Sequence, residues 1–324
     1  MAQTPIRRAC VVVKETYLEL VQAQGDQRQL REIELRKPGV ESVLESHKQH
    51  CFALDAVVNA LSDAGIEIDV VKRSKDYLVE RMAPADLIVT VGGDGTVLRA
   101  SHYILGSTPV VGVNSAPITS FGHYCICDAQ GFADTLAAIR EGYLKPSPLL
   151  RLRAVLNGEP LPELVLNEIM ITHQHPAGTS RYQVTRGALS EQQRSSGMII
   201  ATPAGSTGFL RSEGGTILPI DDRRFAFQER APFLRLDEEH RLQSGLVEQG
   251  DVLTIVSQMQ GGKLYIDGEH IQYDFSRGAV LTIEACSTPL IAYVDPDCHQ
   301  PFIDEARRKT SLWREVKKRL VSLF

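Results

Sequence analysis

The first 145 residues alternate short apolar segments with helical ones, and this rhythm constrains the fold more than any other feature. The apolar segments are residues 9–13, 66–71, 86–91 and 109–114. Between and after them, residues 40–64 and 131–142 repeat apolar side chains at the spacing of one helix face. Strands that are apolar throughout are typical of a parallel sheet covered by helices on both faces. We therefore expect residues 1–145 to form an α/β domain with a parallel sheet.

The pattern changes at the two prolines of "YLKPSPLL" (143–150). Beyond them, short β-rich segments are separated by Asn-Gly, Asp-Gly and Gly-Gly turn signals. This pattern predicts a mostly antiparallel β domain over residues 146–295. Residues 296–324 are helical again, and we expect this tail to dock on a domain surface. Its apolar stripe consists of Trp313, Val316, Leu320 and Leu323.

Composition and charge exclude several classes of protein. The net charge of −5 argues against a general nucleic-acid binder. No apolar run is long enough to span a bilayer, and the amino terminus has no signal-peptide core. Six cysteines without zinc-ligand spacing predict reduced thiols rather than a disulfide framework. We expect a cytoplasmic protein that binds neither nucleic acid nor membrane. The polar residues 17–37 fit either a loop or a short surface helix.

A glycine-rich turn, "VGGDGT" (91–96), follows the third apolar segment and precedes a helical pattern. Glycines allow unusual backbone angles, and N–H groups at such a turn and helix start suit a phosphate. The motif is neither a Walker A sequence nor a dinucleotide fingerprint, because no G-K-[ST] follows and Leu98 replaces the third glycine. Alone, the turn is more simply interpreted as a connection with an N-capping Asp or Thr.

Two later stretches also carry polar groups at strand ends. In "SSGMIIATPAGSTGFLRSEGG" (195–215), an apolar strand runs into a turn rich in glycine and hydroxyls. That turn either offers hydrogen-bond donors to a ligand or joins a strand to a capped helix. In "VLNEIMI" (165–171), Asn167 and Glu168 point to opposite faces of a strand. Either both reach a ligand near the strand's end, or one of them only faces solvent.

Together and in this order, the three stretches resemble the NAD kinase family. The family's G-G-D-G-T is met by residues 92–96, and its N-[DE] by Asn167-Glu168. Its D-G-[LM]-[IV]-[IV]-[AS]-T-P-T-G-S-T-A-Y-x-x-S-x-G-G aligns without a gap with residues 196–215, and "PVVGVN" contributes Asn114. The resemblance runs from about residue 85 to about residue 285. It implies the two-domain NAD kinase-like fold and transfer of the γ-phosphoryl of ATP to the 2′-hydroxyl of the adenosine ribose of NAD, giving NADP.

The resemblance also implies roles for individual residues. Asp94 would take the proton of the ribose hydroxyl, and Mg²⁺ would bridge the phosphates of ATP rather than sit in a side-chain cluster. The implied phosphate- or nucleotide-binding residues are Gly92, Gly93, Gly95, Thr96, Arg99 and Asn114. The implied NAD-binding residues are Asn167, Glu168, Arg194, Ser196, Thr202, Ser206, Thr207, Gly208, Phe209, Ser212 and Asp267. Asp267-Gly268 fits an Asp-Gly hairpin turn equally well. A homodimer or homotetramer is implied as well.

Because the sequence departs from the family pattern, it does not decide which nucleotide accepts the phosphoryl group. The family's aspartate is Ser196 here, its Ala-Tyr pair is Gly208-Phe209, and "SAPITSFGHYC" follows Asn114. By the resemblance, Ser196 and Phe209 lie near the nicotinamide side of the dinucleotide. The acceptor is therefore NAD, NADH or a related nucleotide, and the donor is ATP, another triphosphate or polyphosphate.

Two alternatives from other classes remain. Diacylglycerol and sphingosine kinases share a similar G-G-D-G-T turn and a comparable two-domain layout, so a lipid kinase is one of them. The other is a non-catalytic NAD-sensing paralogue, which the loss of the acid at Ser196 allows. Asp94 argues against the sensor, because binding alone does not require a carboxylate beside phosphates.

Overall fold

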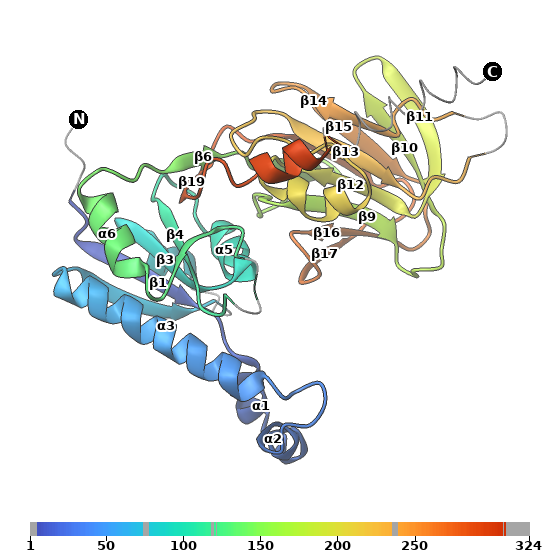
Figure 1. Cartoon of the computed structure of the whole chain (residues 1–324). Helices are drawn as coiled ribbons and strands as arrows, with labels where there is room; N and C mark the ends of the chain where they lie inside the picture. Colours follow the sequence, from blue (N-terminus) through green and yellow to red (C-terminus); the bar gives the residue numbers. More distant parts are fainter. Residues whose placement is uncertain are drawn as a thin grey trace, which may run out of the picture. The chain divides into compact units, whose positions relative to one another are not determined.

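The computed structural model describes residues 5–73, 78–117, 120, 122–234, 239–306 and 308. The chain forms two units (Figure 1). The first comprises Met1–Pro148 and Leu290–Asp295, and the second comprises Leu149–Pro289 and Pro296–Phe324. The helix predicted around Trp313 lies outside the described residues. In the part of the chain that is described, no helix is long and apolar enough to cross a membrane.

The first unit is built on a seven-stranded sheet with the order β2-β1-β3-β4-β19-β6, and β5 pairs with β4 as well. Its strands are β1 (Arg8–Val13), β2 (Glu67–Lys72), β3 (Leu87–Gly92), β4 (Val110–Asn114), β5 (Cys125–Asp128), β6 (Ser147–Leu149) and β19 (Leu290–Tyr293). The pairs β1–β2, β1–β3, β3–β4, β4–β5 and β4–β19 are parallel. The predicted parallel sheet is confirmed. β19 comes from residues that the sequence placed in the β domain, so the chain returns to its first unit after forming the two sheets of the second.

The helices of the first unit pack against this sheet or against the long helix that covers it. They are α1 (Tyr17–Gln24), α2 (Gln27–Glu34), α3 (Val43–Asp63), α4 (Leu78–Met82), α5 (Asp94–Ser101) and α6 (Phe132–Arg140). α3 and α6 pack on one face, where Val57 and Phe132 share a core with Val11 and Val89 of the strands (Figure 1). α5 packs against β1, β3 and β4. The undecided residues 17–37 are largely helical.

The second unit contains two six-stranded sheets whose pairings are antiparallel, which confirms the predicted β-rich part. One has the order β11-β10-β15-β18-β7-β8 and the other β14-β13-β12-β9-β16-β17. Their strands are β7 (Leu152–Leu156), β8 (Glu159–Pro160), β9 (Glu168–His173), β10 (Ser180–Arg186), β11 (Leu189–Ser195), β12 (Gly197–Ala201), β13 (Phe225–Arg230), β14 (Ser244–Val247), β15 (Val252–Ser257), β16 (Gly262–Ile266), β17 (Ile271–Asp274) and β18 (Val280–Ala285). Tyr182 and Phe227, from different sheets, belong to one buried core. A 3-10 turn (Ala204–Thr207) and α7 (Phe209–Ser212) follow β12.

Candidate active site

The G-G-D-G-T turn joins β3 to α5 at the carboxyl edge of the parallel sheet, and its first two glycines are required by space. A Cβ on Gly92 would lie 2.1 Å from Oγ1 of Thr96, and one on Gly93 would lie 2.5 Å from Oγ of Ser120. Thr96 is 1% exposed, so its side chain fills the space beneath the turn, and its Oγ1 has no hydrogen-bond partner among the described residues. The chain therefore folds tightly here and presents the start of α5.

Gly95 lies at the exposed side of this turn, next to a cluster of cations. Among the described residues, a Cβ on Gly95 would meet only Nη1 of Arg73, at 3.6 Å. Burial, with repulsion from Arg73 second, lowers the pKa of Lys14. Burial also lowers the pKa of Arg73, which Glu15 opposes and Arg99 reinforces. Concentrated positive charge beside a helix N-terminus attracts a polyanion such as a triphosphate.

Asp94 is the first residue of α5, and its carboxylate is held in place. Oδ1 accepts a hydrogen bond from the buried backbone N–H of Tyr124 at 2.8 Å. Within the described chain, no donor reaches Oδ2. The charge of Asp94 also acts on His123, where it raises a pKa that burial lowers more strongly. One oxygen is thus oriented by the fold, and the other has no donor among the described residues.

Asn114 ends β4, and both polar atoms of its side chain hold the loop that follows. Nδ2 donates to the carbonyl of Ser120 at 3.1 Å, and Oδ1 accepts from the N–H of Ala116 at 3.1 Å. Gly122, at φ +65°, packs against it so closely that a Cβ would lie 2.4 Å from Nδ2. Asn114 thereby shapes the segment that leads to Tyr124, the residue that orients Asp94.

In the second unit, Asp267 holds the backbone of the Asn-Glu segment. It sits at φ +48° in the turn between β16 and β17, so it does form the Asp-Gly turn. Its carboxylate accepts from the N–H groups of Leu166, Asn167 and Glu168 at 2.9, 2.7 and 3.1 Å. Burial and then the charge of Asp267 raise the pKa of Glu168 to about 8. This shift favours the protonated form of Glu168, which is able to donate a hydrogen bond.

The T-P-A-G-S-T-G loop packs directly against the same segment. The N–H of Thr202 donates to the carbonyl of Asn167 at 2.9 Å, and a Cβ on Gly205 would lie 2.3 Å from that carbonyl oxygen. The Thr202 hydroxyl accepts from the N–H of Gly205 at 3.1 Å, and the Ser206 hydroxyl accepts from the N–H of Leu218 at 3.0 Å. Both hydroxyl residues are 0% exposed. They hold the loop together instead of facing solvent.

A pocket of about 540 Å³ opens beside these elements. Three predicted site residues, Glu168, Ser196 and Phe209, line it together with Arg230 and Tyr265. The Arg230 guanidinium lies 5.9 Å from the centre of the Phe209 ring, and Nε donates to Oε1 of Glu213 at 2.9 Å.

The remaining predicted residues lie outside the described lining of this pocket. Arg194 is on β11, where its carbonyl accepts from the N–H of Phe233 at 2.7 Å. Thr207 ends the 3-10 turn, and the Ser212 hydroxyl donates to the carbonyl of Gly208 at 3.4 Å within α7.

Sequence reasoning missed Arg230 in the second unit and Lys14 and Arg73 in the first. Arg230 is the last residue of β13, and the sequence "FAFQER" predicts a strand. The pairing of Arg230 with Gly197 cannot be predicted from that sequence. Lys14 and Arg73 directly follow β1 and β2. Their positions after two predicted parallel strands could have indicated that these cations lie together at the carboxyl edge of the sheet.

Comparisons with known proteins agree with this geometry. The family model of the ATP-NAD kinase N-terminal domain matches residues 3–143, and that of the C-terminal domain matches residues 166–237. A "Probable NADH kinase" of Oryza sativa subsp. japonica is 34% identical over 251 residues, which cover 71% of this chain and 77% of that protein. An "NADH kinase" of Arabidopsis thaliana is 31% identical over 274 residues, which cover 78% and 86%.

The fold is shared with a solved structure. The NAD kinase from Archaeoglobus fulgidus in complex with ATP superposes with a TM-score of 0.65 at 21% identity, covering 92% of this chain and 98% of that one. The two domain models and the two plant relatives decide the assignment: this chain belongs to the ATP-NAD kinase family.

Proposed function

We propose that this protein transfers the γ-phosphoryl group of ATP to the 2′-hydroxyl of the adenosine ribose of NAD or NADH. The observation that carries the proposal is Asp94, a carboxylate oriented by the Tyr124 N–H at the start of α5 in a chain that both ATP-NAD kinase domain models match. The solved relative of the same fold is described in complex with ATP, which supports ATP as the donor.

In this proposal the first unit supplies the phosphoryl-transfer chemistry. The carboxylate of Asp94 accepts the proton of the attacking ribose hydroxyl as the new O–P bond forms. The start of α5, with Arg73 and Lys14 beside it, binds the triphosphate. The exposed Gly95 leaves room for phosphate oxygens, and the Asp94 carboxylate is a suitable oxygen ligand for a divalent cation, so the residues present fit Mg²⁺ carried by ATP. When bound, Mg²⁺ neutralises charge on the transferring phosphate.

The second unit binds the dinucleotide in the same proposal. Asn167 and Glu168 are anchored by Asp267 and by the T-P-A-G-S-T-G loop, which makes them a rigid binding segment. A protonated Glu168 donates a hydrogen bond to the ligand without placing a second negative charge near its phosphates. We place the nicotinamide end in the 540 Å³ pocket, as the family resemblance implies.

The loss of the family's aspartate favours NADH as the better acceptor. The nicotinamide ring of NAD carries a positive charge, and that of NADH is neutral. Ser196 stands where the family has an aspartate, so that carboxylate is missing, and the acidic residues in the described lining are Glu168 and Glu269. Arg230 also lines the pocket, with its guanidinium paired to Glu213. Two relatives, from rice and Arabidopsis, are named NADH kinases, which supports the same preference.

An acceptor screen tests both parts. The purified full chain is given ATP and Mg²⁺ with NAD or NADH, and the phosphorylated product is identified by mass. We expect NADH to have the higher kcat/KM. We expect Ser196→Asp and Arg230→Gln each to move the NAD/NADH ratio of kcat/KM towards NAD by about three- to tenfold, the size of one charge interaction in a partly solvated site.

One control variant and two contrary outcomes complete this test. Ser190→Asp, on the exposed edge strand β11, adds the same charge outside the pocket and should leave the ratio unchanged. Labelled diacylglycerol or sphingosine with unlabelled dinucleotide would establish the lipid kinase instead. Calorimetric binding of NAD without any phosphorylated product would establish the sensor.

Four finer points complete the proposal and rest on the sequence and the family resemblance. They are a Mg²⁺ requirement, a homodimer or homotetramer, a cytoplasmic location, and a tail helix within residues 296–324 that docks on a domain surface. Chelation with EDTA, analytical ultracentrifugation and fractionation of the source cells test the first three, and circular dichroism of a chain ending at residue 308 tests the helix.

A further inference from the structure

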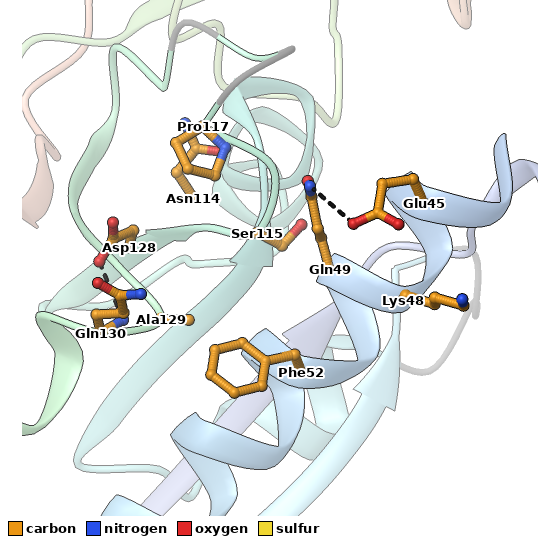
Figure 2. A pocket seen from close by; sticks show the side chains of 10 residues that line it. All are labelled: Glu45, Lys48, Gln49, Phe52, Asn114, Ser115, Pro117, Asp128, Ala129 and Gln130. Carbon is orange, nitrogen blue, oxygen red and sulfur yellow. Dashed lines mark hydrogen bonds between the residues drawn. The ribbon is translucent and has the colours of Figure 1, made fainter. Parts of the chain in front are cut away.

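A second pocket of about 370 Å³ lies within the first unit, and Asn114 is the predicted nucleotide-binding residue in its described lining (Figure 2). α3 forms one wall through Glu45, Lys48, Gln49 and Phe52, and the segments that follow β4 and β5 form the other. Asp94 is not among its described lining residues. The pocket therefore lies at the carboxyl ends of parallel strands, where open α/β sheets bind ligands, and it is large enough for a small molecule.

Ser115 provides an independent sign that the pocket is a binding site. The residue lines the pocket, is 2% exposed, and its Oγ has no hydrogen-bond partner among the described residues. Figure 2 shows this hydroxyl directed towards the α3 side, from which Gln49 and Phe52 come. Buried hydroxyls are normally paired, so a ligand that bonds Ser115 would supply the missing partner.

The other side chains indicate the chemistry of the ligand. Phe52 is 58% exposed at the pocket, so its ring presents a face on which a planar ring can stack. Gln49 and Gln130 offer amide donors and acceptors, and Asp128 accepts hydrogen bonds, two of them from the N–H groups that begin α6. Such a lining matches a heterocycle with an amino group and ring nitrogens.

The charge of the lining excludes a strongly anionic ligand. Glu45 and Asp128 carry two negative charges against the single positive charge of Lys48. A phosphate would add to this excess of negative charge, whereas a neutral base would not. We propose that this pocket is an effector site for an uncharged purine nucleoside, which stacks on Phe52 and hydrogen-bonds Ser115.

The pocket is connected to Asp94 through one short segment. The N–H of Ser115 donates to the carbonyl of Gly92 at 2.8 Å, which ties the pocket wall to the G-G-D-G-T turn. The same segment continues through Ser120, which contacts Asn114 and crowds Gly93, to Tyr124, whose N–H orients Asp94. A ligand that bonds Ser115 therefore acts on the group that holds the proposed base. This effect on activity rests on the proposed function, whereas binding at the pocket does not.

Calorimetry with adenosine on the full chain tests the site. We expect Phe52→Ala to weaken adenosine binding by roughly 5- to 100-fold, the range for loss of a base–aromatic stack. Tyr143→Ala, an 82% exposed aromatic in the same unit, is the matched control and should bind adenosine like the wild type. AMP should bind more weakly than adenosine, because its phosphate adds negative charge.

Ser115→Ala gives a second and independent signature. It should weaken adenosine binding and yet raise the melting temperature of the free protein, because it removes an unpaired buried hydroxyl. A purely structural serine would lower the melting temperature instead. At saturating ATP and dinucleotide, adenosine should change the kcat of the wild type and of Tyr143→Ala but not that of Phe52→Ala.

The outcomes separate this site from the proposed function. Equal adenosine affinity in the wild type and in Phe52→Ala, no adenosine binding at all, or tighter binding of AMP than of adenosine would each overturn the site. Phe52-dependent adenosine binding in a protein that phosphorylates neither NAD nor NADH would keep the site and refute the kinase. An unchanged kcat with Phe52-dependent binding would refute the effector role.

Discussion

Asp94→Asn tests whether the carboxylate acts in catalysis or only stabilises the fold. Asparagine keeps an oxygen that can accept the 2.8 Å bond from the Tyr124 N–H. Replacing a charged acceptor by a neutral one in a single hydrogen bond costs about 1 kcal/mol of unfolding free energy. A positioned general base contributes about 10²- to 10⁴-fold in rate, or about 3–5 kcal/mol of barrier. The variant should therefore lose far more activity than stability.

Two measurements on the same preparation check this difference. The kcat with ATP and NAD or NADH should fall by at least ~10²-fold, and urea unfolding should shift by no more than about 1 kcal/mol. Asp134→Asn, an exposed acid near the start of α6, should stay within about twofold of the wild type in kcat. Near-normal turnover of Asp94→Asn would remove this carboxylate from the mechanism. A loss of activity matched by a stability loss above about 3 kcal/mol would make it structural.

Three further substitutions test other parts of the structure. Gly205→Ala places a Cβ 2.3 Å from the carbonyl oxygen of Asn167 and should destabilise the protein by at least ~2 kcal/mol in urea unfolding. In Gly208→Ala the nearest contact of the new Cβ among the described residues would be an ordinary 3.4 Å, so the unfolding free energy should change by less than about 0.5 kcal/mol. Similar losses in the two variants would refute the packing argument. Arg73→Gln should raise KM for ATP about tenfold and leave KM for the dinucleotide unchanged; a change confined to the dinucleotide would contradict its placement. Glu168 has a folded-state pKa of about 8 against 4.5 in the unfolded chain, so the stability it contributes is complete below pH 4.5 and is lost as the pH rises through about 8. Glu168→Gln should therefore flatten the fall in melting temperature between pH 5 and 8, and an unchanged slope would show that the carboxyl is not buried as described.

The sequence predicted the part of the fold that depends on local patterns. Residues 9–13, 86–91 and 109–114 are apolar throughout because both faces of their sheet are covered, and each is a strand within a residue or two of the predicted bounds. The turn at residues 92–96 was recognisable because its glycines are set by local space, as Gly92 against Thr96 shows.

Strands whose partners lie far along the chain were harder to predict. β11 reads "LSEQQRS", and it is a strand because it pairs along its length with β10, not because its side chains are apolar. β19 has an ordinary apolar sequence, "LIAY", that fits either unit. Its place beside β4 depends on a pairing with residues 182 positions earlier, as from Ala292 to Val110, which no local pattern encodes.

In the candidate site, too, the features set by local sequence were predicted and those set by distant strand pairing were not. Motif order brought together Asn167, Glu168 and the T-P-A-G-S-T-G loop, which the structure places in contact. The inward hydroxyls of Thr202 and Ser206 could not be distinguished by sequence from ligand-facing ones, because both interpretations require the same residue types. Arg230 enters the pocket only through the register of β13 against β12.

The return of the chain at β19 has a consequence for synthesis on the ribosome. Ala292 and Tyr293 pair with Val110 and Val111, so the first unit cannot complete its sheet until residue 293 has emerged. Until then β4 has an open edge at Val110 and Val111, because β5 pairs only with its later residues, and open edges recruit other strands. By contrast, both sheets of the second unit are formed by one continuous stretch, residues 152–285. They can therefore form before the sheet of the first unit is complete. Chaperone demand during production should therefore fall on the amino-terminal half, even though it is translated first.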